Sequence, residues 1–128
     1  MSKHETPLIR AYWQQVGGTL VEEFPAVKRT RDSEARYIDA IIIPGEETRI
    51  ARPSDVSLKG KDIICVQAKR GRLGMYLMGQ ALFSKQLLEK RFASRNVLSI
   101  ALCTADDSAL RPLLEKYDNV RVVVTALQ

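Results

Sequence analysis

Residues 62–69 form an almost unbroken apolar run, Asp-Ile-Ile-Cys-Val-Gln-Ala-Lys, that ends in a lysine. A half-buried strand alternates apolar and polar side chains, whereas a strand that is covered on both faces is apolar throughout. The run therefore predicts a strand in the middle of a sheet. Residues 36–44 are strongly apolar apart from Asp39, and residues 96–103 form another apolar run, so we expect two more long strands.

The other segments complete an α-β-β-β-α-β-α-β order. Thr6 is a candidate N-cap of a first helix, with Pro7 at the first helical position. The strand that follows, residues 19–27, is expected to place Leu20, Glu22 and Phe24 on one face, because side chains alternate along a strand. The remaining predictions are a turn at 28–34, a loop or short irregular segment at 49–60, a helix at 75–92, a short helix at 108–117 and a final strand at 120–127.

This pattern predicts one α/β domain spanning residues 1–128, with a mixed sheet flanked by helices. No apolar stretch has membrane-spanning length and the N-terminus has no apolar signal segment, so we expect a cytoplasmic protein. Cys65 and Cys103 lie inside apolar runs and are expected to be buried free thiols. With one histidine in the chain, a tetrahedral zinc site is disfavoured.

The formal net charge is +5, and basic residues cluster at 28–31, 69–72 and 90–91. These clusters border the predicted elements and do not form a tail. They favour a polyanionic partner such as nucleic acid, and a solvated surface is the alternative explanation for each cluster alone.

Asp39 stands alone in an apolar strand, where a carboxylate is costly to bury unless it is hydrogen-bonded, paired with a cation or bound to a metal. Gln67 and Lys69 lie two residues apart on the next long strand and therefore share a face. A lysine that closes a buried strand needs an anionic partner, and Asp39 is the obvious candidate. A purely structural Asp39–Lys69 ion pair is the alternative to a catalytic role.

An Asp on the second strand of a hairpin, then Gln67-Ala68-Lys69 on the next long strand, then a helix, resembles the PD-(D/E)XK or restriction-endonuclease-like nuclease superfamily. The resemblance covers about residues 5–103, in both motif order and element order. It implies a restriction-endonuclease-like αβββαβ core, to which this chain adds a C-terminal helix and strand. Gln67 departs from the pattern, because that position usually holds Glu or Asp.

The resemblance also implies roles for these residues. Asp39, Gln67 and the backbone carbonyl of Ala68 would be ligands of Mg²⁺ or Mn²⁺, and Lys69 would be the catalytic lysine. Glu5, at the start of the first helix, is favoured as the additional carboxylate, with Glu22 and Glu23 as alternatives.

Further residues are candidates for supporting roles. On the helix after the motif, Tyr76 and Gln80 lie one turn apart, and Gln80 is a candidate neighbour of the active site. Arg36, Arg70 and Arg72 are candidates for contacts with the phosphates next to the cleaved one.

We therefore expect a Mg²⁺-dependent endonuclease that acts on DNA, with a homodimer as the expected assembly. The first alternative is a catalytically inactive nuclease-fold domain that binds nucleic acid or a protein partner, and Gln67 is the feature that motivates it. The second is an interaction module without any nucleic-acid role.

Overall fold

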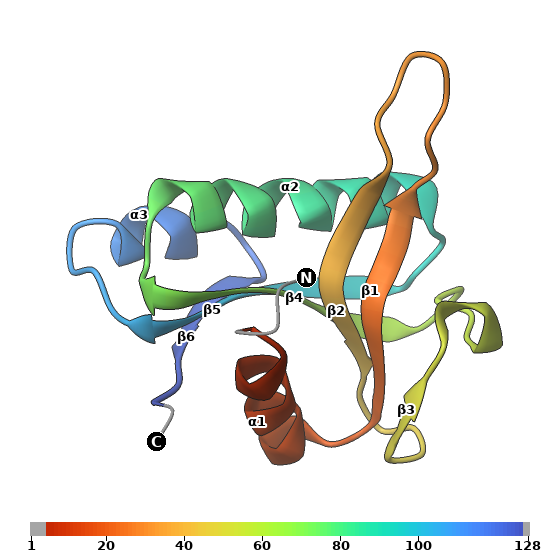
Figure 1. The fold of residues 1–128 in the computed structure, drawn as a ribbon, viewed down its shortest axis with the longest axis horizontal. Coiled ribbons are helices and arrows are strands. Elements are labelled where there is room, and N and C mark those ends of the chain that lie inside the picture. Colours follow the sequence, from red (N-terminus) through yellow and green to blue (C-terminus); the bar gives the residue numbers. More distant parts are fainter. Residues whose placement is uncertain (1–4, 127–128) are drawn as a thin grey trace.

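A six-stranded mixed sheet lies between two helical layers in the computed structural model, which describes residues 5–126 (Figure 1). The strand order is β3-β1-β2-β4-β5-β6. β2 is antiparallel to both β1 and β4, whereas β4, β5 and β6 run parallel to one another. The elements are α1 (Thr6–Val16), β1 (Thr19–Val27), β2 (Arg36–Ile43), β3 (Arg49–Ala51), the 3₁₀ helix η1 (Pro53–Asp55), β4 (Asp62–Arg72), α2 (Met75–Arg91), β5 (Asn96–Ala105), α3 (Arg111–Glu115) and β6 (Val120–Val124).

The predicted α/β class with a mixed, helix-flanked sheet is confirmed. Helix α1 covers one face of the sheet, and α2 and α3 cover the other (Figure 1). Leu8, Ile9 and Tyr12 of α1 pack against the centre of the sheet, including Ile42 of β2 and Val66 of β4. The two faces account for the apolar character of β4, which is buried on both sides from residue 63 to residue 68.

On the opposite face, α2 packs along β4 and β5. Leu88 belongs to the same buried cluster as Ile63 and Cys65, while Leu77 and Ala81 pack near Cys103. Cys65 and Cys103 are buried free thiols, as predicted. No helix in the described part of the chain is both long enough and apolar enough to cross a bilayer.

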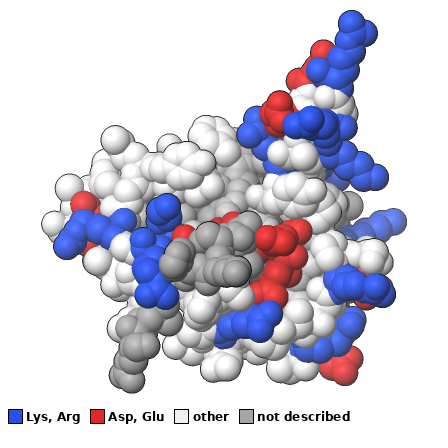
Figure 2. All heavy atoms as spheres, in the orientation of Figure 1, with Lys and Arg blue, Asp and Glu red and all other residues white. Residues whose placement is uncertain are grey.

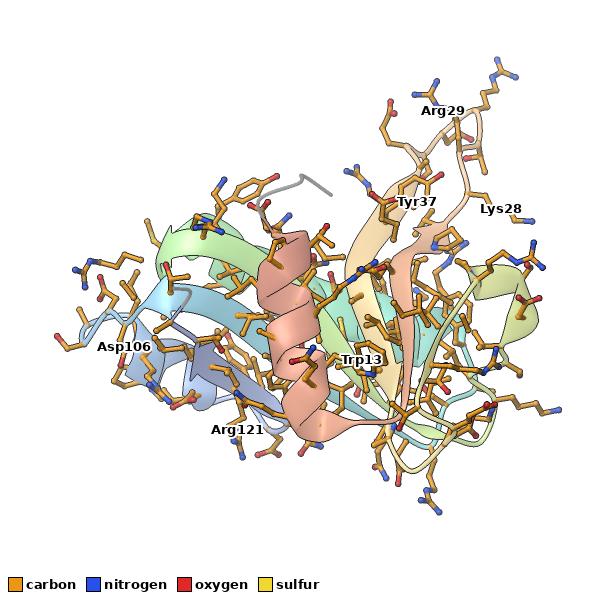
Figure 3. All side chains as sticks on the ribbon, turned by 60° about the horizontal axis from the view of Figure 1, so that its bottom comes forward. Trp13, Lys28, Arg29, Tyr37, Asp106 and Arg121 are labelled. Atoms are coloured by element: carbon orange, nitrogen blue, oxygen red, sulfur yellow. The ribbon has the colours of Figure 1, made fainter. Side chains whose placement is uncertain are left out.

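The connection between β1 and β2 projects from the body of the molecule, and we call residues 28–35 the basic arm (Figure 1). A backbone bridge between Thr30 and Ser33 closes its tip, which confirms the predicted turn. Lys28 and Arg29 point outward along it (Figure 3). The arm therefore presents basic side chains to solvent beside β2.

Several predicted boundaries are wrong for local reasons. Helix α1 begins at Thr6 with Glu5 as its N-cap, because the Glu5 carbonyl accepts the first helical hydrogen bond, from Ile9. Strand β4 continues past Lys69 to Arg72 through a bulge, and Gly71 there takes a φ of 115°.

Other differences concern the loop at 49–60 and the C-terminal part. Strand β3 was not predicted, because three residues carry too little alternation to identify a strand; it pairs in parallel with β1. Helix α3 is shorter than residues 108–117, because the Asp107 carboxylate accepts hydrogen bonds from the backbone N–H groups of Ala109 and Leu110 in a preceding turn. Strand β6 ends at Val124, and residue 127 of the predicted strand lies outside the described residues.

Gly18, just before β1, lies against the backbone at the end of β2, and its replacement by alanine tests this close contact. Its φ is 80°, and an added Cβ would lie 2.3 Å from the carbonyl oxygen of Ile43. Gly45 is a matched control, because its φ is 79° but a Cβ there meets nothing within 4 Å. Each substitution should cost about 1–2 kcal/mol for the left-handed backbone, and Gly18→Ala should cost clearly more. Equal losses of unfolding free energy in urea titrations would contradict the steric explanation.

Candidate active site

The residues of the motif meet where β2 and β4 diverge. The backbone ladder between these strands ends at the Ala40–Val66 pair, although both strands continue. Beyond that pair, Asp39 Oδ2 accepts a hydrogen bond of 2.9 Å from the backbone N–H of Ala68. The Asp39 backbone N–H donates in turn to Gln67 Oε1 at 3.4 Å. Beyond the end of the backbone ladder, hydrogen bonds that involve the Asp39 and Gln67 side chains therefore hold Asp39 beside the Gln67–Ala68 segment.

The neighbouring strand β1 is irregular at the same level. Glu23 lies between the residues that pair with Ala40 and Ile38, so it stands opposite Asp39, and it takes a φ of 51°. A left-handed backbone is costly for a residue with a side chain, and such strain is concentrated at functional sites. Leu20 packs toward α1 but Phe24 packs toward α2, so the predicted common face is wrong at Phe24.

Burial is the main reason that the pKa of Asp39 is raised above its usual value. The hydrogen bond from Ala68 lowers the pKa but does not offset the desolvation, and the nearby negative charges of Glu5 and Glu23 raise it further. Three acidic residues from α1, β1 and β2 therefore influence one site. A divalent cation bound there would relieve both the desolvation and the repulsion.

Glu5 is a buried carboxylate at the N-cap of α1. Its exposed fraction is 9%, and Oε2 has no hydrogen-bond partner among the described residues. A buried carboxylate oxygen without a donor or a cation is unfavourable by itself. Its position at the N-cap of α1 brings it within electrostatic range of Asp39, which supports the preference for Glu5.

Glu22 is committed elsewhere. Arg10 of α1 donates to both of its carboxylate oxygens, at 3.2 and 2.9 Å. This bidentate pair draws Glu22 toward α1, while Glu23 is the residue of the two whose charge acts on Asp39. The structure therefore separates the two alternatives that the alternation along β1 left open.

Gln67 is 3% exposed, and both ends of its amide are engaged. Besides Oε1, which accepts from Asp39, its Nε2 donates to Ser84 Oγ of α2 at 2.6 Å. Ser84 was not singled out in the sequence, since a serine in a helix carries no signal of its partner. The amide therefore links β2, β4 and α2, and it adds no negative charge to the site.

Lys69 is exposed, contrary to the expectation of a lysine that needs an anionic partner within a buried strand. Within residues 5–126, the ion pairs do not include one between Lys69 and Asp39. The reason is that β4 leaves the covered part of the sheet after Ala68. A structural Asp39–Lys69 ion pair, which was the alternative to catalysis, is not formed.

The three arginines differ in their surroundings. Arg70 is exposed beside Lys69, and Arg72 Nη1 donates to the backbone carbonyl of Asp106 after β5. Arg36 lies at the start of β2, where it lines a groove beside α2. Arg70 and Arg36 are therefore available to a ligand, whereas Arg72 also fastens the end of β4 to the neighbouring loop.

A groove of about 600 Å³ runs between the start of β2 and α2. Gln67 and Ser84 line it, together with Tyr76 and Gln80, which the sequence placed near the site. Tyr37 and Phe83 also line it and were not predicted, although Phe83 lies at helical spacing from Tyr76 and Gln80. Gln67 thus belongs both to the groove and to the hydrogen-bonded group at Asp39.

Among residues 5–126, no three side chains of the His, Cys, Asp or Glu type converge in a way that could hold a metal ion. Any ligand set at Asp39 must therefore include neutral oxygens. The Glu5 carboxylate, the Gln67 amide and the Ala68 carbonyl are of the hard-oxygen type that Mg²⁺ prefers. The Glu5 oxygen, which has no partner within residues 5–126, and the desolvated Asp39 carboxylate fit such a cation.

Comparisons with protein-family models, with curated proteins and with solved structures find no match to this chain. Its function is therefore inferred from the geometry and chemistry of the site.

The raised pKa of Asp39 predicts a pH dependence of stability. The folded protein binds this proton more tightly than the unfolded chain does, so the unfolding free energy should fall as pH rises from the usual Asp pKa through the raised one. In Asp39→Asn the unfolding free energy should no longer fall over this pH range, so the variant should gain stability relative to the wild type at pH values above the raised pKa. Urea titrations between about pH 4 and pH 8 with a chelator present measure the effect.

Asp55→Asn is the control for this measurement, because Asp55 is an exposed aspartate of η1. Its profile should follow that of the wild type. Parallel profiles for all three proteins would show that Asp39 does not titrate as inferred.

Proposed function

We propose that this chain is a Mg²⁺-dependent endonuclease with a restriction-endonuclease-like core, acting on DNA. The observation that carries the proposal is the buried Glu5 oxygen that has no donor among residues 5–126, within electrostatic range of the desolvated Asp39 carboxylate where β2 and β4 diverge. The αβββαβ order expected of that core corresponds to α1, β1, β2, β4, α2 and β5, with β3 and η1 inserted and α3 and β6 added. This agreement in element order supports the proposal.

Asp39, Glu5, Gln67 and the Ala68 carbonyl are the groups that would hold Mg²⁺ or Mn²⁺. The chemistry that such a cation supplies is neutralisation of phosphate charge and a lower pKa of a coordinated water. Asp39 is kept in place by the Ala68 N–H, and its backbone by Gln67, so the carboxylate needs little reorganisation to bind. Such preorganisation is a large part of what a protein contributes to catalysis.

Lys69 follows on the same strand, after the last covered residue. Its exposed ammonium group can orient or help to deprotonate the attacking water and can offset the charge that develops on phosphorus. Arg70, also exposed, is placed to contact the next phosphate. Lys69 is therefore given the role of catalytic lysine.

One observation favours an inactive relative that binds nucleic acid without cutting. Both ends of the Gln67 amide already have protein partners, and an amide lacks the charge of the usual carboxylate. Its bond to the Asp39 N–H is long, at 3.4 Å, so the oxygen retains capacity for another ligand. Because Gln67 Oε1 can still bind a metal ion, we favour the active enzyme.

Cleavage of supercoiled and branched DNA with Mg²⁺ or Mn²⁺ tests the proposal. Asp39→Asn and Lys69→Ala should each reduce the rate by at least about 100-fold, because each removes a group that acts at the reacting phosphate. Asp55→Asn in η1 and Lys90→Ala in the last turn of α2, both at exposed positions, are the controls and should retain the rate. Cleavage that persists in both site variants would exclude this site, and salt-sensitive binding without any cleavage would favour the inactive relative.

Gln67→Glu tests the metal site directly. The added charge should raise Mg²⁺ affinity by about tenfold in a calorimetric titration, since affinity in oxygen sites follows ligand charge. The Ser84 hydroxyl can donate to the new carboxylate, so the interior contact survives. Gln86→Glu adds the same charge at an exposed position of α2 and should leave the affinity unchanged. Identical affinities in all three proteins would show that Gln67 is not a ligand.

A further inference from the structure

The solvent-facing side of α2 carries large apolar side chains. Tyr76 is 78% exposed and Phe83 60% exposed, and Tyr37 of β2, on the other wall of the groove, is 63% exposed. The sheet-facing side of the same helix is already apolar, with Leu77 and Leu88 buried. A surface helix normally has one polar side, so aromatic groups on the outer side of α2 indicate a bound partner.

Gly79 lines the groove on the side of α2. Tyr76, Gly79 and Phe83 follow one another at helical spacing along the groove wall, and a Cβ built on Gly79 meets nothing within 4 Å. Glycine inside a helix costs about 1 kcal/mol relative to alanine, and here no close contact requires it. A larger side chain at position 79 would therefore extend into the groove between Tyr76 and Phe83 in the helical sequence.

The charge of the groove selects the partner. Arg36 is its one charged lining residue among the described residues, and no carboxylate lines it. The basic arm stands directly beside it: Tyr37 lies at the base of the arm and Arg29 near its tip (Figure 3). The space-filling view shows basic side chains, with acidic ones among them, on the arm at one edge of the molecule (Figure 2). A second copy of this chain, related by a twofold axis, would bring the Arg36 side chains of both copies to one interface whose described lining residues include no carboxylate, which disfavours self-association here.

We propose that this groove seats unpaired nucleotides, so that the preferred substrate is DNA with a single-stranded segment. Exposed aromatic rings stack on free base faces, which an intact duplex does not present, while neighbouring cations follow the phosphates. The amide of Gln80, which lines the groove, supplies a donor and an acceptor for base edges. Because Gln67 also contacts Asp39, a strand whose bases lie in the groove has its backbone next to the candidate active site.

This inference rests on the proposed nuclease function for its biological meaning, but its test does not require cleavage. Binding of fluorescently labelled oligo(dT) of about 20 nucleotides and of a matched duplex is measured by anisotropy with a chelator present, at two salt concentrations. The wild-type chain should bind the single strand at least about tenfold more tightly than the duplex. The same measurement with oligo(U) shows whether binding distinguishes deoxyribose from ribose.

Gly79→Leu fills the groove without removing any existing contact. It should weaken oligo(dT) binding by at least about tenfold, leave duplex binding unchanged and keep or raise the melting temperature, because leucine favours the helix. Tyr76→Ala removes one stacking surface at an exposed position and should weaken oligo(dT) binding by about tenfold. Tyr117→Ala, at an exposed tyrosine after α3, is the matched control and should change nothing.

Equal affinity for single strand and duplex would overturn the proposal, as would unchanged oligo(dT) binding in folded Gly79→Leu and Tyr76→Ala. Light scattering that detects a dimer which Gly79→Leu dissociates would assign the groove to self-association instead. The proposed nuclease function fails separately: specific oligo(dT) binding without cleavage in Mg²⁺ would reject the enzyme and keep the groove. Cleavage in Mg²⁺ without any preference for single strands would keep the enzyme and reject the groove as a nucleotide site.

Discussion

The hydrogen bond from the Ala68 backbone N–H to the Asp39 carboxylate is the contact on which the rest of the site depends. At this level the ladder between β2 and β4 has ended, so an N–H at the sheet interior would otherwise lack its strand partner. The carboxylate satisfies it and is itself held in a desolvated place. This hydrogen bond therefore replaces the missing backbone pairing and holds the Asp39 carboxylate in place. Beyond it, β2 separates from β4 toward the basic arm.

The divergence of the two strands creates two surfaces with opposite chemistry. On one side, the charges of Glu5 and Glu23 act on the Asp39 carboxylate, and acidic side chains lie near the middle of the view in Figure 2. Toward α2, the groove has aromatic walls and carries Arg36 but no acid among its described lining residues. Gln67 belongs to both surfaces. A cation on the first and a nucleic-acid strand on the second are mutually compatible, since the strand brings the phosphates that a cation neutralises.

Much of this arrangement could be predicted from the sequence. The burial of β4 follows from its apolar run, and the position of Asp39 and Gln67 on neighbouring strands follows from the order of the elements. The exposure of Lys69 could not be predicted, because it depends on where β4 leaves the covered part of the sheet. The partners of Gln67 were equally hidden, since one of them lies 17 residues away on α2.

The sequence by itself determined the class of fold, the central strands and the set of polar residues that could carry chemistry, because hydrophobic periodicity and the cost of burying charge are local properties of the chain. Tertiary structure alone decided which of these residues meet. It joined Glu22 to Arg10, left the Glu5 oxygen free among the described residues, and set Tyr37 of β2 against α2 across the groove. The physical reason is that each outcome joins residues from different elements, so it arises only when distant segments pack together.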